Sequence, residues 1–150
     1  MSTLNHCAVS DVVMRVVLIE DLREVREGLA ALINGTPGYK CVAAYSLMET
    51  ALARIEKDSP DLVLTDLGLP GMSGIEGIER LRAMFPETPI LALTIYDNDE
   101  QIFNALCNGA NGYLLKNTPP ARLLEALKEA VEGGSPMSPA IASPIASTSR

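Results

Sequence analysis

The sequence predicts an α/β protein with a doubly wound parallel sheet of five strands and five helices. Five short apolar runs alternate with five segments of helical periodicity, and strict alternation of this kind favours a parallel sheet. The apolar runs are continuous, which is typical of strands covered on both faces. With 150 residues and a hydrophobic content of 47 %, the chain has enough aliphatic material for the core of one domain.

The five predicted strands are short and rich in Val, Leu and Ile, and the second is the weakest. They cover residues 15–20, 40–45, 62–65, 90–94 and 112–116. Because connections between parallel strands are right-handed, few topologies remain for such a chain.

The first three predicted helices each carry a start or stop signal. The first covers 24–34 and ends before a glycine. Ser46, followed three residues later by Glu49, has the spacing of a capping box and predicts the start of the second. The third covers about 74–84, and Pro86 prevents its continuation.

The last two predicted helices also have recognisable ends. Asp97, with Glu100 three residues later, predicts the cap of the fourth helix, which ends at Gly109. Thr118 and Pro119 begin the fifth, because proline is favoured at the first helical position. Two adjacent glycines end that helix.

Composition divides the chain into one domain and two flanking segments. Residues 1–13 have no periodicity and predict a flexible N-terminal extension, whereas 14–134 carry all five strand and helix pairs. Residues 135–150 are rich in Ser, Pro and Ala and predict a flexible tail or linker remnant.

Charge and composition argue against several functions. A net charge of −7 makes the chain itself a poor ligand for nucleic acid or an anionic membrane. It has no apolar run near the ~20 residues of a membrane helix and no secretory signal, so we expect a cytoplasmic protein. Three widely spaced cysteines predict two buried thiols and one in the N-terminal segment. The single histidine, His6, lies outside the domain, which argues against Ser-His or Cys-His catalysis.

Polar residues end four of the five predicted strands. The first strand ends in Glu20 and Asp21, the third in Asp66, the fourth in Thr94 and the fifth in Lys116. Ligands of open parallel sheets bind beyond the carboxyl ends of the strands. If the first and third strands are neighbours, three carboxylates therefore meet at one edge.

This set of groups predicts phosphoryl transfer onto Asp66. Clustered carboxylates repel one another, and a hard cation such as Mg²⁺ relieves that repulsion. A carboxylate nucleophile, Mg²⁺, the ammonium of Lys116 and the hydroxyl of Thr94 together suit a phosphoryl group. Each residue also has a structural reading, as a helix-start acid, a turn former, a solvated lysine or a β-former, but their coincidence at one edge favours the site.

The same residues resemble the receiver domain of two-component response regulators. The resemblance covers about residues 14–134 and rests on Glu20-Asp21, Asp66 in LVLTDLGLPGMSG, Thr94 in LALT, and Lys116 in NGYLLK. The stretches LTDLGLPGMSGIE, GANGYLLK and GGSPMSP are most similar to the NarL/LuxR-type subfamily. The resemblance implies a flavodoxin-like (CheY-like) fold with strand order 2-1-3-4-5.

The resemblance also implies roles for the acids. Asp66 would accept a phosphoryl group from a sensor histidine kinase. Asp21, Asp66 and the backbone carbonyl of Gly68 would bind Mg²⁺, with Glu20 acting mainly through water. Apart from its own phosphorylation and dephosphorylation, no enzymatic activity is implied.

The remaining implied residues act after phosphorylation. Lys116 would contact the phosphoryl oxygens, Thr94 would move toward them, and Tyr113 would change rotamer with it. Pro70 matches the proline of the family's loop. This switch would control an output, which in the subfamily is transcription through a DNA-binding domain, and would accompany a possible phosphorylation-dependent homodimer.

Two positions depart from the family pattern. Position 68 is glycine, where a side chain often affects hydrolysis of the phosphoaspartate, and Ile95 follows Thr94 where many receivers have a small residue. We expect the bulk of Ile95 to slow dephosphorylation by a partner. The sequence SPIASTSR also stands where DNA-binding helices would follow, which favours a receiver-only fragment over a natural end.

Two other functions compete with this interpretation. A Mg²⁺-dependent phosphatase or phosphotransferase is disfavoured because Asp66-Leu67-Gly68 lacks the DxDxT pattern and no cap domain is inserted. A stand-alone receiver or a phosphorylation-independent pseudo-receiver remains the alternative, although retention of the acids, Thr94 and Lys116 argues against the latter.

Overall fold

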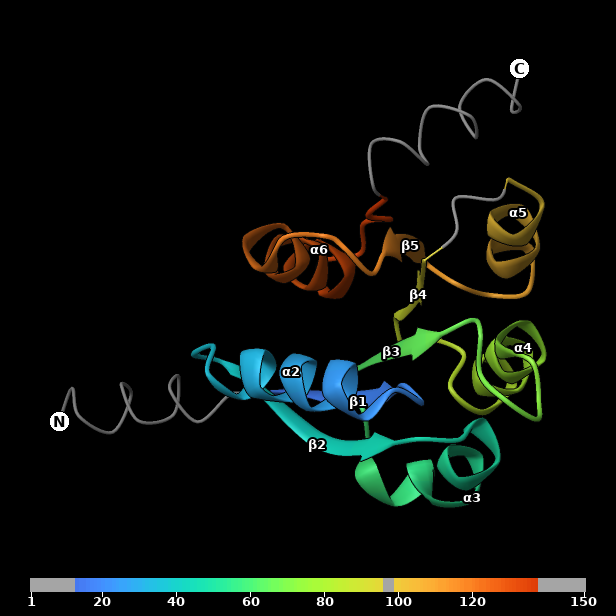
Figure 1. Cartoon of the computed structure of the whole chain (residues 1–150), viewed down its shortest axis with the longest axis horizontal. Coiled ribbons are helices and arrows are strands. Elements are labelled where there is room, and N and C mark those ends of the chain that lie inside the picture. The colour runs from blue at the N-terminus through green and yellow to red at the C-terminus, as the bar shows by residue number, and fades with distance from the viewer. Residues whose placement is uncertain (1–12, 96–98, 138–150) are drawn as a thin grey trace, which may run out of the picture.

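The computed structural model describes residues 13–95 and 99–137 and contains a single five-stranded sheet (Figure 1). All neighbouring strands are parallel, in the order β2-β1-β3-β4-β5. The strands are β1 (Met14–Ile19), β2 (Tyr39–Tyr45), β3 (Leu62–Asp66), β4 (Ile90–Thr94) and β5 (Gly112–Leu115). The predicted fold class and strand order are confirmed.

Helices cover both faces of this sheet (Figure 1). They are α2 (Arg23–Asn34), α3 (Met48–Asp58), α4 (Gly74–Met84), α5 (Asp99–Cys107) and α6 (Pro120–Val131). One core cluster joins the sheet to α3, α4 and α5, and the other joins it to α2 and α6. Every residue of β3 and β4 is buried, as expected of central strands covered on both faces.

One predicted helix start is wrong, and another is shifted by one residue. Helix α3 begins at Met48 after Leu47, without a side-chain cap, and the Glu49 carboxylate accepts the N–H of Met72 instead (3.1 Å). Tertiary contact with a distant loop thus replaces the local capping box. In α6, Pro119 precedes the helix and Pro120 is its first residue. The predicted cap at Asp97 lies outside the described residues.

The cysteine prediction is also partly wrong. Cys41 is half-buried, but Cys107, at the end of α5, is exposed rather than buried. Cys7 lies outside the described residues. In the part of the chain that the structure describes, no helix is long and apolar enough to span a bilayer.

The segment after α6 reaches the edge of the sheet. Residues 135–137 fall within the segment predicted to be a tail or linker, and they lie along β5. Because these strands are neighbours and run parallel, the carboxyl ends of β1, β3, β4 and β5 lie side by side at one end of the sheet. Their amino-terminal ends lie at the other. The polar side chains that end these four strands therefore share one edge.

Candidate functional site

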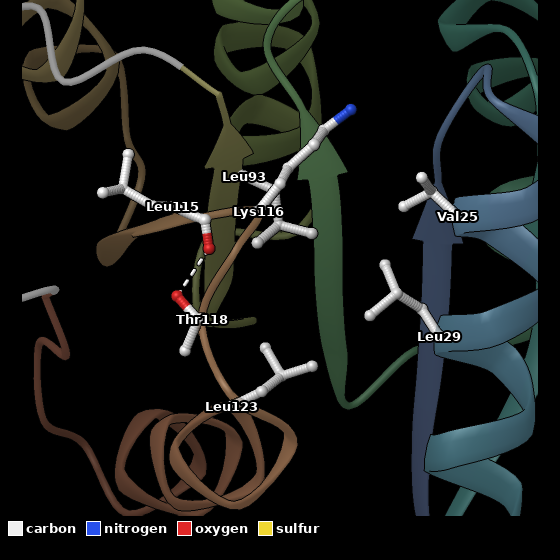
Figure 2. Close-up of a pocket in the computed structure, with 7 residues that line it drawn as sticks. All are labelled: Val25, Leu29, Leu93, Leu115, Lys116, Thr118 and Leu123. Atoms are coloured by element: carbon white, nitrogen blue, oxygen red, sulfur yellow. Dashed lines mark hydrogen bonds between the residues drawn. The ribbon is translucent and has the colours of Figure 1, made fainter.

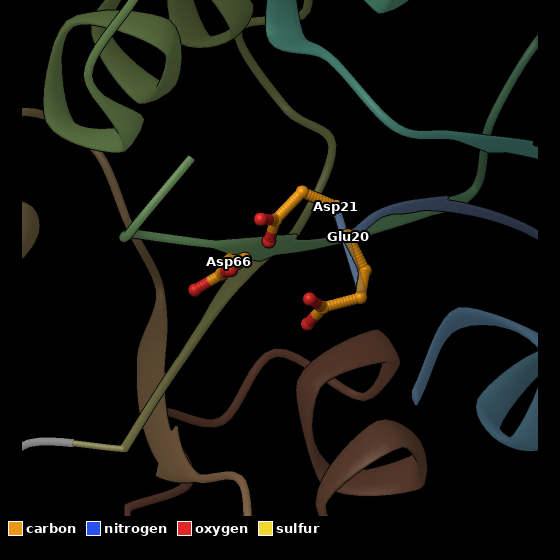
Figure 3. A group of neighbouring side chains, drawn as sticks. All are labelled: Glu20, Asp21 and Asp66. Atoms are coloured by element: carbon orange, nitrogen blue, oxygen red, sulfur yellow. The ribbon is translucent and has the colours of Figure 1, made fainter. Parts of the chain in front are cut away.

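Three carboxylates meet beyond the ends of β1 and β3. Oxygens of Glu20, Asp21 and Asp66 lie within 4.8 Å of one another (Figure 3). The parallel pairing of β1 with β3 produces this proximity, because both strands end at the same height. The convergence predicted from the strand ends is therefore present in the structure.

Asp66 is the last residue of β3 and is only 3 % exposed. Its Oδ1 accepts the backbone N–H of Gly68 (2.9 Å), and its Oδ2 accepts from Lys116 Nζ (3.0 Å). These two donors fix the orientation of the carboxylate. The carboxylate also borders a cavity of about 240 Å³, so that a ligand entering the cavity would meet it.

Glu20 is fully buried. Its Oε2 accepts the backbone N–H of Leu22 (3.0 Å), whereas its Oε1 lies 2.7 Å from Lys116 Nζ without hydrogen-bond geometry. Burial raises the pKa of Glu20 above its ordinary value, although its contact with the lysine and the bond to the backbone N–H lower it. The charged form of this carboxylate is therefore costly in the folded protein.

Lys116 supplies the positive charge among these acids. Burial alone would lower the pKa of Lys116, but its contacts with Glu20 and Asp66 outweigh burial and raise this pKa. Figure 2 shows its stem beside Leu93, with Nζ extending past the ends of the strands. One ammonium balances one of the three carboxylates, so the group stays acidic.

The stem of Lys116 borders a small cavity of about 30 Å³ (Figure 2). Val25 and Leu29 of α2 line it from one side, and Leu123 of α6 lines it from another. The Thr118 hydroxyl donates to the carbonyl of Leu115 and shapes the turn that follows β5. The apolar wall holds the stem, while the ammonium alone reaches the acids.

Thr94 on β4 and Tyr113 on β5 occupy different surroundings. Thr94 ends β4, is 2 % exposed and lines the larger cavity together with Asp21 and Asp66. Tyr113 is fully buried in the core cluster that the sheet forms with α3, α4 and α5. Thr94 thus lines the cavity that contains Asp66, whereas Tyr113 belongs to the core.

Two close contacts hold the loop between β3 and α4 in place. A Cβ at Gly74 would lie 2.5 Å from Leu67 Cα, so only glycine allows the helix to begin so close to the loop. At the other side, Glu49 binds the backbone of Met72, next to Gly71 at φ +78°. At Gly68, a Cβ would meet only Asp66 Oδ1, at an ordinary 3.7 Å.

Sequence reasoning singled out Ile95 at the site but missed Leu22 and the contact that holds this loop. The contact of Glu49 with Met72 spans 23 residues and has no local signal. Leu22 and Ile95 are 54 % and 67 % exposed, and both line the cavity beside the acids. Exposed apolar residues directly after strand-end polar residues could have been read as a rim, but exposure itself is not visible in the sequence.

Comparison with known proteins agrees with this geometry. The response regulator receiver domain family matches residues 16–128. The oxygen regulatory proteins NreC of Staphylococcus haemolyticus and Staphylococcus aureus are each 36 % identical over 121 residues, which are 80 % of this chain and 56 % of theirs. The chain therefore spans about half the length of these curated relatives.

A solved structure extends the likeness to the whole fold. The LuxR-family two-component response regulator from Aurantimonas sp. SI85-9A1 superposes with a TM-score of 0.86 and is 35 % identical. The match covers 91 % of this chain and 98 % of that one. With its acidic strand ends, its strand order and these relatives in agreement, the chain belongs to the response regulator receiver domain family, in the NarL/LuxR-type subfamily.

Proposed function

We propose that this chain is a phosphorylation-dependent switch in which Asp66 accepts a phosphoryl group from a phosphohistidine of a sensor kinase. The observation that carries the proposal is the Asp66 carboxylate at the tip of β3, 3.0 Å from Lys116 Nζ and within an acidic group that spans 4.8 Å. Because the chain belongs to the receiver domain family, we interpret this aspartate as the phosphoacceptor.

We further propose that the acidic group holds Mg²⁺. Three carboxylates lie within 4.8 Å of one another, and Glu20 Oε1 is buried with no hydrogen-bond donor in the part of the chain that the structure describes, so a hard cation suits this donor set. Asp21, Asp66 and the carbonyl of Gly68 would hold the ion, and Glu20 would act mainly through water. The bound ion would neutralise charge on the transferring phosphoryl group.

In this proposal, one residue of the chain accepts the phosphoryl group and two others contact it afterwards. An oxygen of Asp66 attacks phosphorus, the bond from phosphorus to the imidazole nitrogen breaks, and the kinase histidine leaves. Lys116 is already beside Asp66 and balances the phosphoryl charge. The Thr94 hydroxyl, at the next strand end, would donate to a phosphoryl oxygen.

The response would spread from β5. Engagement of Thr94 and Lys116 would shift the population of the region around α5, β5 and α6, with Tyr113 changing its rotamer. We propose that this shift controls a homodimer or an output such as transcription, through a LuxR-type DNA-binding domain. We also place the protein in the cytoplasm, where a sensor kinase would phosphorylate it.

Intact-mass spectrometry tests the proposal directly. The protein would be incubated with acetyl phosphate and Mg²⁺, alongside Asp66→Asn and a sample with EDTA. We expect one added phosphoryl group, absent from both controls. No adduct on folded protein that binds Mg²⁺ would contradict the proposal and favour a pseudo-receiver, whereas turnover of a small phosphate ester would favour a phosphatase.

A further inference from the structure

The outer edge of β5 is occupied by the chain's own C-terminal segment. As the last strand of the sheet, β5 turns one row of backbone groups away from β4, and such rows readily pair with another strand. The N–H of Tyr113 in this row donates to the carbonyl of Pro136 (3.1 Å). Tyr113 and Met137 form a parallel bridge, so the segment occupies the position of a sixth strand.

A glycine turn brings the segment back to the sheet (Figure 1). Helix α6 ends at Val131, and Gly133 follows it at φ +96°, a conformation that side chains other than glycine rarely adopt. The chain then runs parallel to β5. Together β5, α6 and residues 136–137 form a β-α-β arrangement like those in the rest of the sheet.

Several contacts besides the bridge fit the segment to this edge. Pro136 is buried, and its carbonyl would lie 2.4 Å from a Cβ at Gly112, so only glycine in β5 allows this approach. The Arg122 guanidinium of α6 donates to the carbonyl of Met137 (3.2 Å). The Met137 side chain packs against the core cluster that contains Tyr113.

Tyr113 links this edge to the phosphoacceptor. Its backbone N–H holds the segment, its ring is buried in the core, and Lys116, three residues later, contacts Asp66. A change that draws Lys116 toward a phosphoryl group must therefore act on the strand that carries the segment.

We propose that the β5 edge is a docking site for residues 135–137 and that docking is coupled to the phosphorylation state of Asp66. The coupling rests on the proposed function, whereas the docking does not. Whatever follows residue 137 then leaves the domain from a point fixed on β5, which gives the switch a direct route to its output. New contacts of Lys116 with a phosphoryl group would order β5 and tighten the docking.

Hydrogen exchange of the Tyr113 amide, measured by NMR on the full 150-residue chain, tests the docking. We expect this amide to be protected in the native protein and to exchange about tenfold faster in Gly133→Ala, which strains the returning turn. Gly28→Ala is the matched control, because the added Cβ meets no surrounding described residue within 4 Å at either position and, of the two, only Gly133 has a positive φ.

Two outcomes would overturn the docking. One is an unprotected Tyr113 amide in the native protein. The other is equal protection of Tyr113 in Gly133→Ala and Gly28→Ala. Arg122→Gln provides a second variant, and we expect a smaller acceleration because it removes one bond to Met137 and leaves the turn intact.

A second measurement tests the coupling. With acetyl phosphate and Mg²⁺, we expect Tyr113 exchange to slow several-fold in the native chain and to stay unchanged in Asp66→Asn. Unchanged or faster exchange in a sample whose mass confirms the phosphoryl group would overturn the coupling. Absence of the mass adduct would instead contradict the proposed function and the coupling with it, and the docking would still be judged by the exchange of the unmodified chain.

Discussion

Charged side chains are used differently at the two ends of the sheet. At the amino-terminal end, Arg82 of α4 donates to the carbonyls of Phe85, Pro86 and Gly109 and to Asn111 Oδ1. Arg15 of β1 similarly donates to the carbonyls of residues 58 and 59. Each guanidinium therefore has several acceptors.

At the carboxyl-terminal end, the balance is reversed. Glu20 and Asp66 share one ammonium, with Asp21 beside them, and the fully buried Glu20 has no hydrogen-bond donor to its Oε1 among the described residues. Like charges held together at low solvent exposure destabilise the fold. The two ends therefore differ in charge balance. At the amino-terminal end, here called the fastened end, each arginine has several acceptors. At the carboxyl-terminal end negative charge exceeds positive charge, and a cation and a phosphoryl group are expected to bind there.

Removal of the Lys116 ammonium should cause the largest loss of stability. Lys116→Met leaves the carboxylates of Glu20 and Asp66 facing each other, so we expect a loss of about 3 kcal/mol of unfolding free energy at neutral pH without Mg²⁺. Urea unfolding followed by circular dichroism would measure it, since the chain has no tryptophan.

Lys57→Met is the control for Lys116→Met, because Lys57 is exposed in the last turn of α3 and should change stability by less than about 0.5 kcal/mol. The Lys116→Met loss should shrink on acidification, because burial raises the pKa of Glu20 and protonation of this carboxyl removes its repulsion with Asp66. A loss that is equal at acid and neutral pH would show that packing of the lysine stem, rather than charge, is responsible.

The next largest effect is expected at the fastened end. Arg82→Ala leaves the carbonyls of Gly109 and Pro86 without their donor, and we expect a loss of about 2 kcal/mol. Arg80→Ala, on the same helix, removes only an exposed contact with Glu76 and should cost less than about 0.5 kcal/mol. Phosphoryl incorporation per folded molecule should be unchanged in both variants, and its loss in Arg82→Ala would show that the two ends are not independent.

The sequence predicted the fold and the acidic end well for a physical reason. Both depend on short-range patterns, namely continuous apolar strands and the polar residue that ends each one. The parallel order then places Glu20, Asp66 and Thr94 at one edge without further information. The roles of these residues, and the boundaries of the domain, remain predictions.

The fastened end and the loops were less predictable because their partners are distant in sequence. Arg82 reaches Gly109 and Asn111, which lie 27 and 29 positions away, and Glu49 reaches Met72 instead of its own helix. Residues 135–137 pair with β5 through backbone groups, which a Ser- and Pro-rich composition does not reveal. Tertiary contacts of this kind override local capping and composition.

Glu20→Gln should have a smaller effect on the unfolding free energy and should stabilise the protein, unlike Lys116→Met and Arg82→Ala. Because the folded protein raises the pKa of Glu20, its charge costs stability above that raised pKa, and the cost disappears below the ordinary value of 4.5. We expect the variant to be about 1 kcal/mol more stable at neutral pH without Mg²⁺ and equal to the native protein near pH 4. A variant that is less stable at neutral pH would indicate that the Lys116 contact outweighs burial.

The smallest effect is expected at the apolar rim of the acidic end. Ile95 is 67 % exposed and lines the cavity that contains Asp66 and Lys116, so its side chain narrows the approach without contributing to the core. Ile95→Ala should leave unfolding free energy unchanged within about 0.5 kcal/mol. It should shorten the half-life of the phosphoaspartate, which can be followed by intact mass after removal of acetyl phosphate. Because the carboxylates, Lys116 and Thr94 remain in place, the initial incorporation should be retained, and a half-life shorter in the native protein than in Ile95→Ala would contradict the shielding role of this side chain.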